Sequence, residues 1–437
     1  FGSSCASSAR AMSLNVVPVP GPLDSESRVP YRRDDTAILS RLINKPTVGH
    51  TFDSSGVKER NWQWARPQVE GVTPTPRGGH TATLVGPFGE GETAIGAHII
   101  IFGGHAYAGE AEGWQYFNDT TILDVDQNTW VTPRCKGTPP EARYGHSASL
   151  VGVRVVYFGG RGKSGTHFRD LHALDASSLT WYQGPSSGGA PAARHGHSST
   201  LHGTNLLIFG GNCKSHFFGD LHVLDLHSMA WQMPDTQGPR PSPRTQHGAL
   251  LIGDNLLVFG GFCMDQPVAS KPTNGQLLQS CYLSDVRVLD VDKFVWSRLR
   301  THGQPPTARY GHSVVLSGDD VVIFGGWSGK KQCDFCGVVQ GKTGAAHHAA
   351  CPISTNSAPT LEPSTGEDKE MSVEYLCSLT TQNMRWNRCN FSGVPPSRRY
   401  GHTCTTIGPH LIIFGGWDGG KPLNDLVVLR DRSGDGQ

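Results

Sequence analysis

The segment RYGHSASLVGVRVVYFGGRGKSGTHFRDLHALDASSLTW, residues 143–181, contains four features in a fixed order. An Arg precedes a His by three residues, an apolar run ends in a Gly pair, an LD dipeptide follows, and a Trp closes the unit. This order occurs six times along the chain, and the sixth copy lacks the Trp. Repeats of about 50 residues, with short apolar runs bounded by Gly and Pro, are typical of a β-propeller.

The spacing within the repeats is nearly constant. The interval between the His and the first Gly, as from His146 to Gly159, is the same in five copies and longer in the first. The interval from the Leu of the LD dipeptide to the Trp, as from Leu174 to Trp181, is the same in all five copies that have a Trp. The paired glycines, the spaced aromatic residue and the Trp resemble the kelch family over roughly residues 62–430. The resemblance implies one four-stranded blade per repeat around a channel. We name the strands a (starting at the His), b (ending at the Gly pair), c (the LD run) and d (the Trp).

The strand missing from the sixth copy is found at the other end of the chain. Each Trp precedes the next His by the same interval, as from Trp130 to His146, and the same interval counted back from His80 reaches Trp64. The sequence therefore predicts an all-β, six-bladed kelch propeller whose last blade is closed by an N-terminal strand d, which leaves no open edge. We expect residues 1–60 to be an irregular extension with a short helix at 35–43, residues 61–430 to be the propeller, and residues 431–437 to be a tail.

Composition narrows the class of protein. Among 437 residues, 37% are hydrophobic, 17% are charged, and there are 55 Gly and 29 Pro, which suits short strands and turns. The net charge of +1 gives no general indication of nucleic acid or an anionic membrane, and no apolar run is long enough for a transmembrane helix. Eleven scattered cysteines in a large chain favour reduced thiols and a cytoplasmic location, with cytoskeletal association as one option.

Most signature residues have a structural interpretation. The Gly pairs suit crowded strand ends, and each Trp is expected to pack between blades. Six histidines at equivalent places are expected to make buried hydrogen bonds, because a catalytic centre is usually a singular feature. These residues are His80, His146, His197, His247, His312 and His402.

The arginines three residues before each His allow two interpretations. They lie in the d–a loops, and kelch substrate adaptors use arginines at similar loop positions to contact acidic peptides. A ring of guanidinium groups could therefore read carboxylates. The alternative, which we favour for most of them, is an ion pair within the scaffold, with Asp124, Asp175, Asp225 or Asp290 as partners.

Residues after each Gly pair and after each Arg vary from copy to copy, as expected of a binding face. Trp, Tyr and Arg are also enriched at interface hot spots. The candidate partner-binding residues are Arg143, Tyr144, Arg194, His195, Arg309, Tyr310, Trp327, Arg399, Tyr400 and Trp417. The b–c loops of blades 1, 4 and 5 are long, so residues 105–117, 262–283 and 327–372 should crowd the same face.

The longest insertion, in blade 5, contains a candidate metal site. Cys333 and Cys336 are in C-x2-C spacing, and His347 or the adjacent His348, together with Cys351, could complete a set of four ligands that suits a structural zinc ion, with Cys377 as a spare ligand. The alternative is a flexible loop with unligated thiols, because the polar segment that follows is typical of disorder.

We find no nucleophile elbow, Walker loop or HExxH helix in the sequence. The favoured function is a non-catalytic protein-interaction scaffold within a hetero-complex, with no cofactor required. One alternative is a ubiquitin-ligase adaptor for an acidic peptide, although no BTB or F-box pattern is visible. A second alternative is a propeller enzyme with an axial metal.

Overall fold

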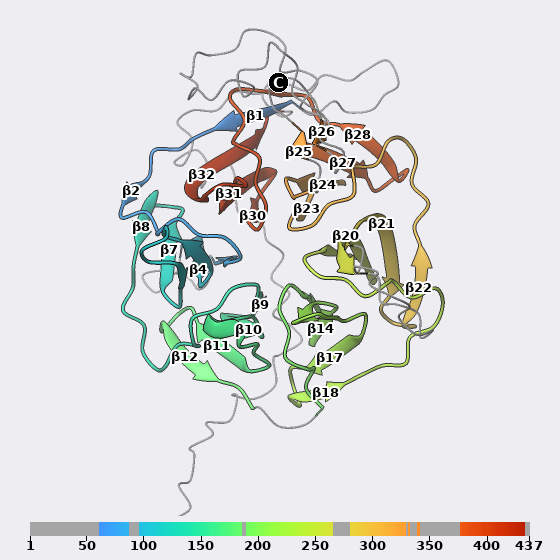
Figure 1. Ribbon diagram of the computed structural model, residues 1–437, viewed down its shortest axis with the longest axis horizontal. Coiled ribbons are helices and arrows are strands. Elements are labelled where there is room, and N and C mark those ends of the chain that lie inside the picture. The colour runs from blue at the N-terminus through green and yellow to red at the C-terminus, as the bar shows by residue number, and fades with distance from the viewer. Residues whose placement is uncertain are drawn as a thin grey trace, which may run out of the picture. The chain divides into compact units, whose positions relative to one another are not determined.

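The computed structural model describes residues 61–86, 96–185, 189–264, 280–328, 331–332, 339–340 and 376–432 (Figure 1). The expected helix at 35–43, the four candidate zinc ligands, residues 87–95 of the blade 1 a–b loop and residues 433–437 lie outside these ranges. Within the described residues, no helix has the length and hydropathy needed to cross a membrane.

Six antiparallel sheets surround a central axis and form a six-bladed propeller (Figure 1). Each blade has four strands in the order a, b, c, d from the axis outward. Blade 1 is β3 (Thr81–Val85), β4 (His98–Phe102), β7 (Thr120–Asp124) and β8 (Thr129–Val131); blade 2 is β9 (Ser147–Val151), β10 (Arg154–Phe158), β11 (Leu171–Asp175) and β12 (Thr180–Gln183); blade 3 is β13 (Ser198–His202), β14 (Asn205–Phe209), β17 (Leu221–Asp225) and β18 (Ala230–Gln232). Blade 4 is β19 (Gly248–Ile252), β20 (Asn255–Met264), β21 (Ser280–Asp290) and β22 (Val295–Arg298); blade 5 is β23 (Ser313–Ser317), β24 (Asp320–Phe324), β27 (Leu376–Thr380) and β28 (Arg385–Arg388); blade 6 is β30 (Thr403–Ile407), β31 (His410–Trp417), β32 (Pro422–Asp431) and β1 (Trp62–Ala65).

The closing strand lies where the repeat spacing predicted it. β1 is the outer strand of blade 6 and pairs antiparallel with β32, with Trp64 opposite Leu429. Two short parallel strands extend the outer edges: β2 (Glu70–Gly71) pairs with β8, and β29 (Phe391–Ser392) pairs with β1. The ring is therefore closed by the two ends of the repeat region, and the long edge of β32 is covered.

Each strand d Trp packs against the strand b Phe of the preceding blade, as the sequence indicated. Trp181 lies 4.9 Å from Phe102 between ring centroids, and Trp296 lies 5.1 Å from Phe209. The same contact occurs at the other four edges, including the closing one, where Trp64 lies 5.5 Å from Phe324. These aromatic contacts, together with fully buried residues of strand b, form a hydrophobic core between each blade and the next.

The two faces of the propeller carry different connections. The b–c and d–a loops emerge on one face, which we call the rim face. The a–b and c–d turns emerge on the opposite face, which we call the turn face. On the rim face, the b–c connection of blade 1 contains the hairpin β5 (His105–Tyr107) with β6 (Trp114–Tyr116), and that of blade 2 contains the 3-10 turn η2 (Lys163–Gly165). The b–c connection of blade 3 contains the hairpin β15 (Asn212–Cys213) with β16 (His216–Phe217), and that of blade 5 contains the pair β25 (Lys331–Gln332) with β26 (Val339–Gln340).

Candidate partner-binding face

The repeated arginines lie inside the scaffold. Arg143 is 1% exposed and donates two parallel hydrogen bonds to the Asp170 carboxylate, at 2.6 and 2.9 Å. Its Nη1 also donates to the Gly159 carbonyl at 2.9 Å, and its Nε donates to the Glu141 carbonyl at 2.8 Å. The Phe168 ring lies 4.0 Å from the guanidinium carbon. The side chain thus ties the d–a loop to strand b and to the start of strand c of its own blade.

The carboxylate partners differ from those we expected. The aspartates that pair with the arginines lie immediately before strand c in blades 1, 2 and 3, and within the longer strands β21 and β32 in blades 4 and 6: Asp119, Asp170, Asp220, Asp285 and Asp425. Our expectation that Asp124, Asp175, Asp225 or Asp290 would fill this role was wrong, because those residues lie at the far ends of the c strands, on the turn face. Burial alone would raise the pKa of Asp170, but hydrogen bonds from Arg143 and His172 hold that pKa well below its usual range.

Burial corrects the interpretation of four candidate partner-binding residues. Arg143, Arg194, Arg309 and Arg399 are between 0 and 5% exposed. In each of them a guanidinium nitrogen donates to the carbonyl of the first Gly of the pair. A carboxylate on another protein cannot reach these buried groups, so the ring of carboxylate-reading arginines is not formed. The scaffold interpretation, which we favoured for most of them, holds for these four.

The repeated histidines form a ring around the axis. Nε2 of His146 shares a hydrogen bond with Thr81 Oγ1 of the preceding blade at 3.1 Å, and His80, His197, His247 and His402 make the equivalent contact. His312 differs, because the residue at the equivalent position is Gly248, which has no hydroxyl group. Burial, together with the charge of the nearby Arg, lowers the pKa of His146 and His312 to about 3. These histidines are neutral scaffold residues at neutral pH.

The residues that follow each repeated Arg and those that follow each Gly pair, which vary from copy to copy, lie side by side in the structure. In every blade, the residue after the Arg and the residue after the Gly pair form a β-bridge, as in the two 2.9 Å hydrogen bonds between Tyr144 and Arg161. The six bridges are Gly78–His105, Tyr144–Arg161, His195–Asn212, Thr245–Phe262, Tyr310–Trp327 and Tyr400–Trp417. These twelve positions surround the mouth of the axis on the rim face.

A closed ring of backbone hydrogen bonds supports the mouth. The ring is formed by the residue two positions after each repeated Arg. The N–H group of this residue donates to the carbonyl of the equivalent residue in the preceding copy, as Gly145 does to Gly79, at 2.7–2.9 Å. Gly79 of the first copy donates to Gly401 of the last copy, which closes the ring. All six residues have positive φ, and in blade 4 the position is taken by Gln246, with φ of 50°. Glycine is favoured at such angles, so the five Gly residues let the loops meet closely around the axis.

The remaining candidates differ in how much surface they offer. His195 and Trp417 are buried, at 6 and 7% exposed, so their rings serve mainly as packing beneath the face. Tyr310, Trp327 and Tyr400 are half-buried and contact one another edge to face. Tyr144 is also half-buried. Four of the ten candidates therefore keep aromatic surface on the rim face.

Two rim residues were not singled out from the sequence. Trp114 and Tyr107, on the β5–β6 hairpin, are 52 and 41% exposed. Trp114 stacks on His105 with ring centroids 5.2 Å apart and lies 5.5 Å from Trp417 of blade 6. His105 in turn stacks on Tyr144 at 4.0 Å. We call His105, Tyr107, Trp114, Tyr144 and Trp417 the aromatic rim cluster. In the sequence, the aromatic residues of the insertion at 105–117 were the feature that could have indicated it.

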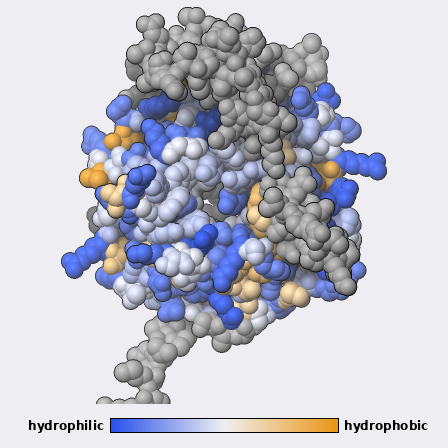
Figure 2. Space-filling view, in the orientation of Figure 1, coloured by the Kyte–Doolittle hydropathy of each residue, from blue (hydrophilic) through white to orange (hydrophobic). Residues whose placement is uncertain are grey.

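The aromatic rim cluster is electrically neutral near pH 7. Burial lowers the pKa of His105 to about 4, and burial raises the pKa of the Tyr144 hydroxyl. The neighbouring cation is Arg161, whose Nη1 donates to the Tyr144 hydroxyl at 3.2 Å. Seen along the axis, the surface is mainly hydrophilic, and hydrophobic residues form small separate groups (Figure 2). A neutral aromatic cluster suits recognition by contact area rather than by charge.

Comparison with known proteins agrees with this architecture. The family model described as the KLHDC2/KLHL20/DRC7 Kelch-repeats domain matches residues 89–326, and the Kelch motif model matches residues 398–432. The chain therefore belongs to the kelch-repeat family.

Similar proteins include members with additional regions. Acyl-CoA-binding domain-containing protein 5 of Arabidopsis thaliana is 32% identical over 71% of this chain and 42% of its own length. Host cell factor of Drosophila melanogaster is 26% identical over 88% of this chain and 23% of its own length. The Rab9 effector protein with kelch motifs of Bos taurus is 37% identical over 28% of this chain and 32% of its own length. The matches thus span less than half of each of these relatives.

Proposed function

We propose that this chain is a non-catalytic interaction scaffold that holds a protein partner on its rim face, within a larger cytoplasmic assembly. The observation that carries the proposal is the exposure of Trp114 and Tyr107 beside the buried Trp417. Large aromatic side chains half-exposed at a loop hairpin are costly to leave in water, and they are the side chains most enriched at interface hot spots.

The scaffold beneath this cluster supports the proposal. The repeated Arg–Asp pairs, the histidine ring and the backbone ring at the mouth fix the loop bases, so little conformational entropy is lost when a partner docks. The relatives with printed roles point in the same direction: one is named as an effector of Rab9, and another is named host cell factor.

The proposed partner contacts are chiefly aromatic and apolar. An acidic partner segment was expected from the arginine ring, but that ring is buried, and Arg77, Arg143, Arg194, Arg244 and Arg399 are paired with aspartates. We therefore propose a partner segment with apolar anchors that fit against Trp114 and Tyr107, and polar groups that meet Arg161 and the exposed Glu112 at the edge.

The test compares two surface substitutions. Trp114→Ala removes the rim anchor, whereas Tyr182→Ala removes a ring of similar exposure, 40%, on strand β12. Each variant and the wild type are isolated from cells that express the chain, and co-purifying proteins are quantified by mass spectrometry. We expect Trp114→Ala to lose a stoichiometric partner that Tyr182→Ala retains, with both variants as stable as the wild type. Equal partner recovery from both variants would refute the assignment of the rim face.

A further inference from the structure

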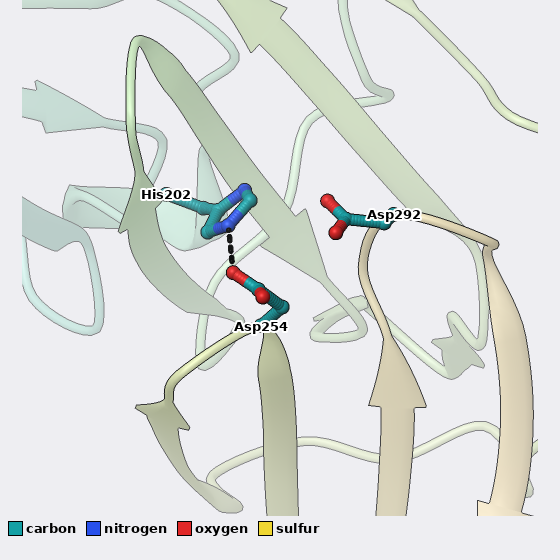
Figure 3. A group of neighbouring side chains, drawn as sticks. All are labelled: His202, Asp254 and Asp292. Atoms are coloured by element: carbon teal, nitrogen blue, oxygen red, sulfur yellow. Dashed lines mark hydrogen bonds and ion pairs between the residues drawn. The ribbon is translucent and has the colours of Figure 1, made fainter.

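Three side chains with metal-binding groups meet on the turn face, at the edge between blades 3 and 4 (Figure 3). His202 is the last residue of β13, Asp254 lies in the turn between β19 and β20 of blade 4, and Asp292 lies in the c–d turn of the same blade. One ligand atom of each residue lies within 4.8 Å of the other two. This cluster lies on the face opposite the aromatic rim cluster.

The three groups lie close enough to share one small cation after a small adjustment. His202 Nε2 and Asp254 Oδ1 are 3.0 Å apart and share a hydrogen bond. Two ligands about 2.1 Å from a tetrahedral zinc ion are separated by about 3.4 Å, so the ion would replace this hydrogen bond and move the two atoms apart by a few tenths of an ångström. The His202 side chain is 24% exposed and that of Asp254 is 64% exposed, so an ion can enter from solvent without opening the blade.

The cluster contains two carboxylates, of which Asp254 is hydrogen-bonded to His202. In the described part of the chain, no donor is hydrogen-bonded to the Asp292 carboxylate, and the adjacent Lys293 ammonium is bonded to Asp290 at 2.6 Å. Blade 5 shows how the same turns are paired elsewhere: Gln382 Nε2 donates to Asp319 at 3.2 Å. Where blade 5 has an amide beside a carboxylate, blade 4 has two carboxylates, and like charges at this separation favour a bound cation.

The repeat provides an internal comparison for this edge. The position of His202, at the end of strand a, is occupied by an apolar residue in four blades and by a Ser in blade 5. In blade 5 that Ser, Ser317, donates instead to the Pro409 carbonyl at 3.1 Å. At other edges the positions equivalent to His202, Asp254 and Asp292 do not form a set of three ligands. In that order they are Val85, Val153 and Ser177 between blades 1 and 2, and Val151, Thr204 and His227 between blades 2 and 3. A set of three ligands on an otherwise periodic frame is a singular feature, and scaffold packing does not require it.

We propose that His202, Asp254 and Asp292 bind one Zn²⁺ ion, with water completing the coordination, and that the ion links blades 3 and 4. One imidazole and two carboxylates favour zinc or nickel over magnesium and calcium, which prefer oxygen ligands alone. Binding to the folded chain would also raise the resistance of this edge to unfolding, because the unfolded chain does not hold the three groups together.

The test separates this site from the candidate ligands in the blade 5 insertion. The full chain carries Cys333→Ser and Cys336→Ser, and zinc chloride is titrated into it by isothermal calorimetry. Asp292→Asn is compared with Asp319→Asn, which changes the blade 5 residue at the position equivalent to Asp254. We expect one zinc ion per chain, at least about ten-fold weaker binding in Asp292→Asn, and unchanged binding in Asp319→Asn. We also expect magnesium and calcium to bind at least about ten-fold more weakly than zinc.

Two results would overturn the proposal. The first is the absence of saturable zinc binding in the double-Ser background. The second is equal binding by Asp292→Asn and Asp319→Asn, which would mean an adventitious ion only. A cobalt titration adds an independent readout, since a His and two carboxylates give no thiolate-to-cobalt charge-transfer band, and a strong band would place the ion on cysteine instead.

Discussion

Mild acid should destabilise this propeller through its histidine ring. All six ring histidines are buried and their pKa values lie well below the usual value of 6.5, to about 3 for His146 and His312. The native state therefore holds neutral imidazole, whereas the unfolded chain takes up protons below pH 6.5. The stability is fully present above that pH and is lost progressively as the pH falls toward 3.

The magnitude follows from linkage. Lowering the pH from 7 to 5.5 stabilises the unfolded state by about 1.2 kcal/mol for each histidine with an unfolded pKa near 6.5 and a folded pKa below about 4.5. His146 and His312, whose pKa values are lowered to about 3, together give about 2.4 kcal/mol, and the other four ring histidines shift the stability in the same direction. Aspartates with lowered pKa values, such as Asp170, add their effect at lower pH, below about 4.

The assay is urea unfolding followed by tryptophan fluorescence at pH 7 and at pH 5.5. His312→Gln is the informative variant, because His312 faces Gly248 and has no hydroxyl partner to lose. We expect this variant to lose about 1 kcal/mol less than the wild type between the two pH values. The control His227→Gln, at an exposed turn position, should lose as much as the wild type. Identical losses in all three proteins would refute the reasoning, and so would a wild-type loss of less than about 1 kcal/mol.

Two further predictions concern the ion pairs and the closing strand. Asp220→Asn should lower the free energy of unfolding in urea by about 3 kcal/mol, because it leaves the buried Arg194 without its carboxylate partner. The control Asp225→Asn, on the turn face, should lower it by about 1 kcal/mol, and equal losses would contradict the observed pairing. Trp64→Ala should cost about 3–5 kcal/mol, because the Trp64 ring fills the blade 5–6 edge beside Phe324, and a cost below about 1 kcal/mol would mean that β1 does not close the ring.

The fold could be predicted from the sequence because each repeat has the same spacing. Constant offsets between His, Gly pair and Trp fix the strand order of every blade, and the interval from Trp64 to His80, which equals that from Trp130 to His146, located the closing strand. The partners of the arginines required the direction of strand c as well. That strand runs from the rim face to the turn face, so the aspartate at its start, such as Asp170, meets the d–a loop arginine.

Exposure on the rim face could not be predicted in the same way. Tyr144, His195 and Trp417 occupy equivalent or bridged positions, yet their exposure depends on which rings of neighbouring blades cover them. Trp114 is exposed because its hairpin rises beside Trp417, a contact between the first and the last blade of the chain. Repeat spacing contains no information on such contacts, since they belong to insertions that differ between copies.

The break in the histidine ring leads to one more prediction. A Cβ atom at Gly248 would lie 2.1 Å from Cγ2 of Val314 and 3.1 Å from Nε2 of His312. The position of Val314 holds Ala, Ser or Cys in the other five blades, so the largest residue at this position faces the smallest residue of the ring. Val314 thus occupies the space that a hydroxyl-bearing side chain takes at the other edges.

A double-mutant cycle tests this complementarity. Gly248→Ser alone should destabilise the chain by about 1–3 kcal/mol through overpacking, and Val314→Ala alone should destabilise it by leaving a small cavity. Combined, the two changes should recover at least about 1 kcal/mol relative to the sum, because the Ser hydroxyl can then bond to His312 as Thr81 does to His146. Additive costs in urea unfolding would show that the two positions do not share this space, and that the missing hydroxyl at blade 4 has another cause.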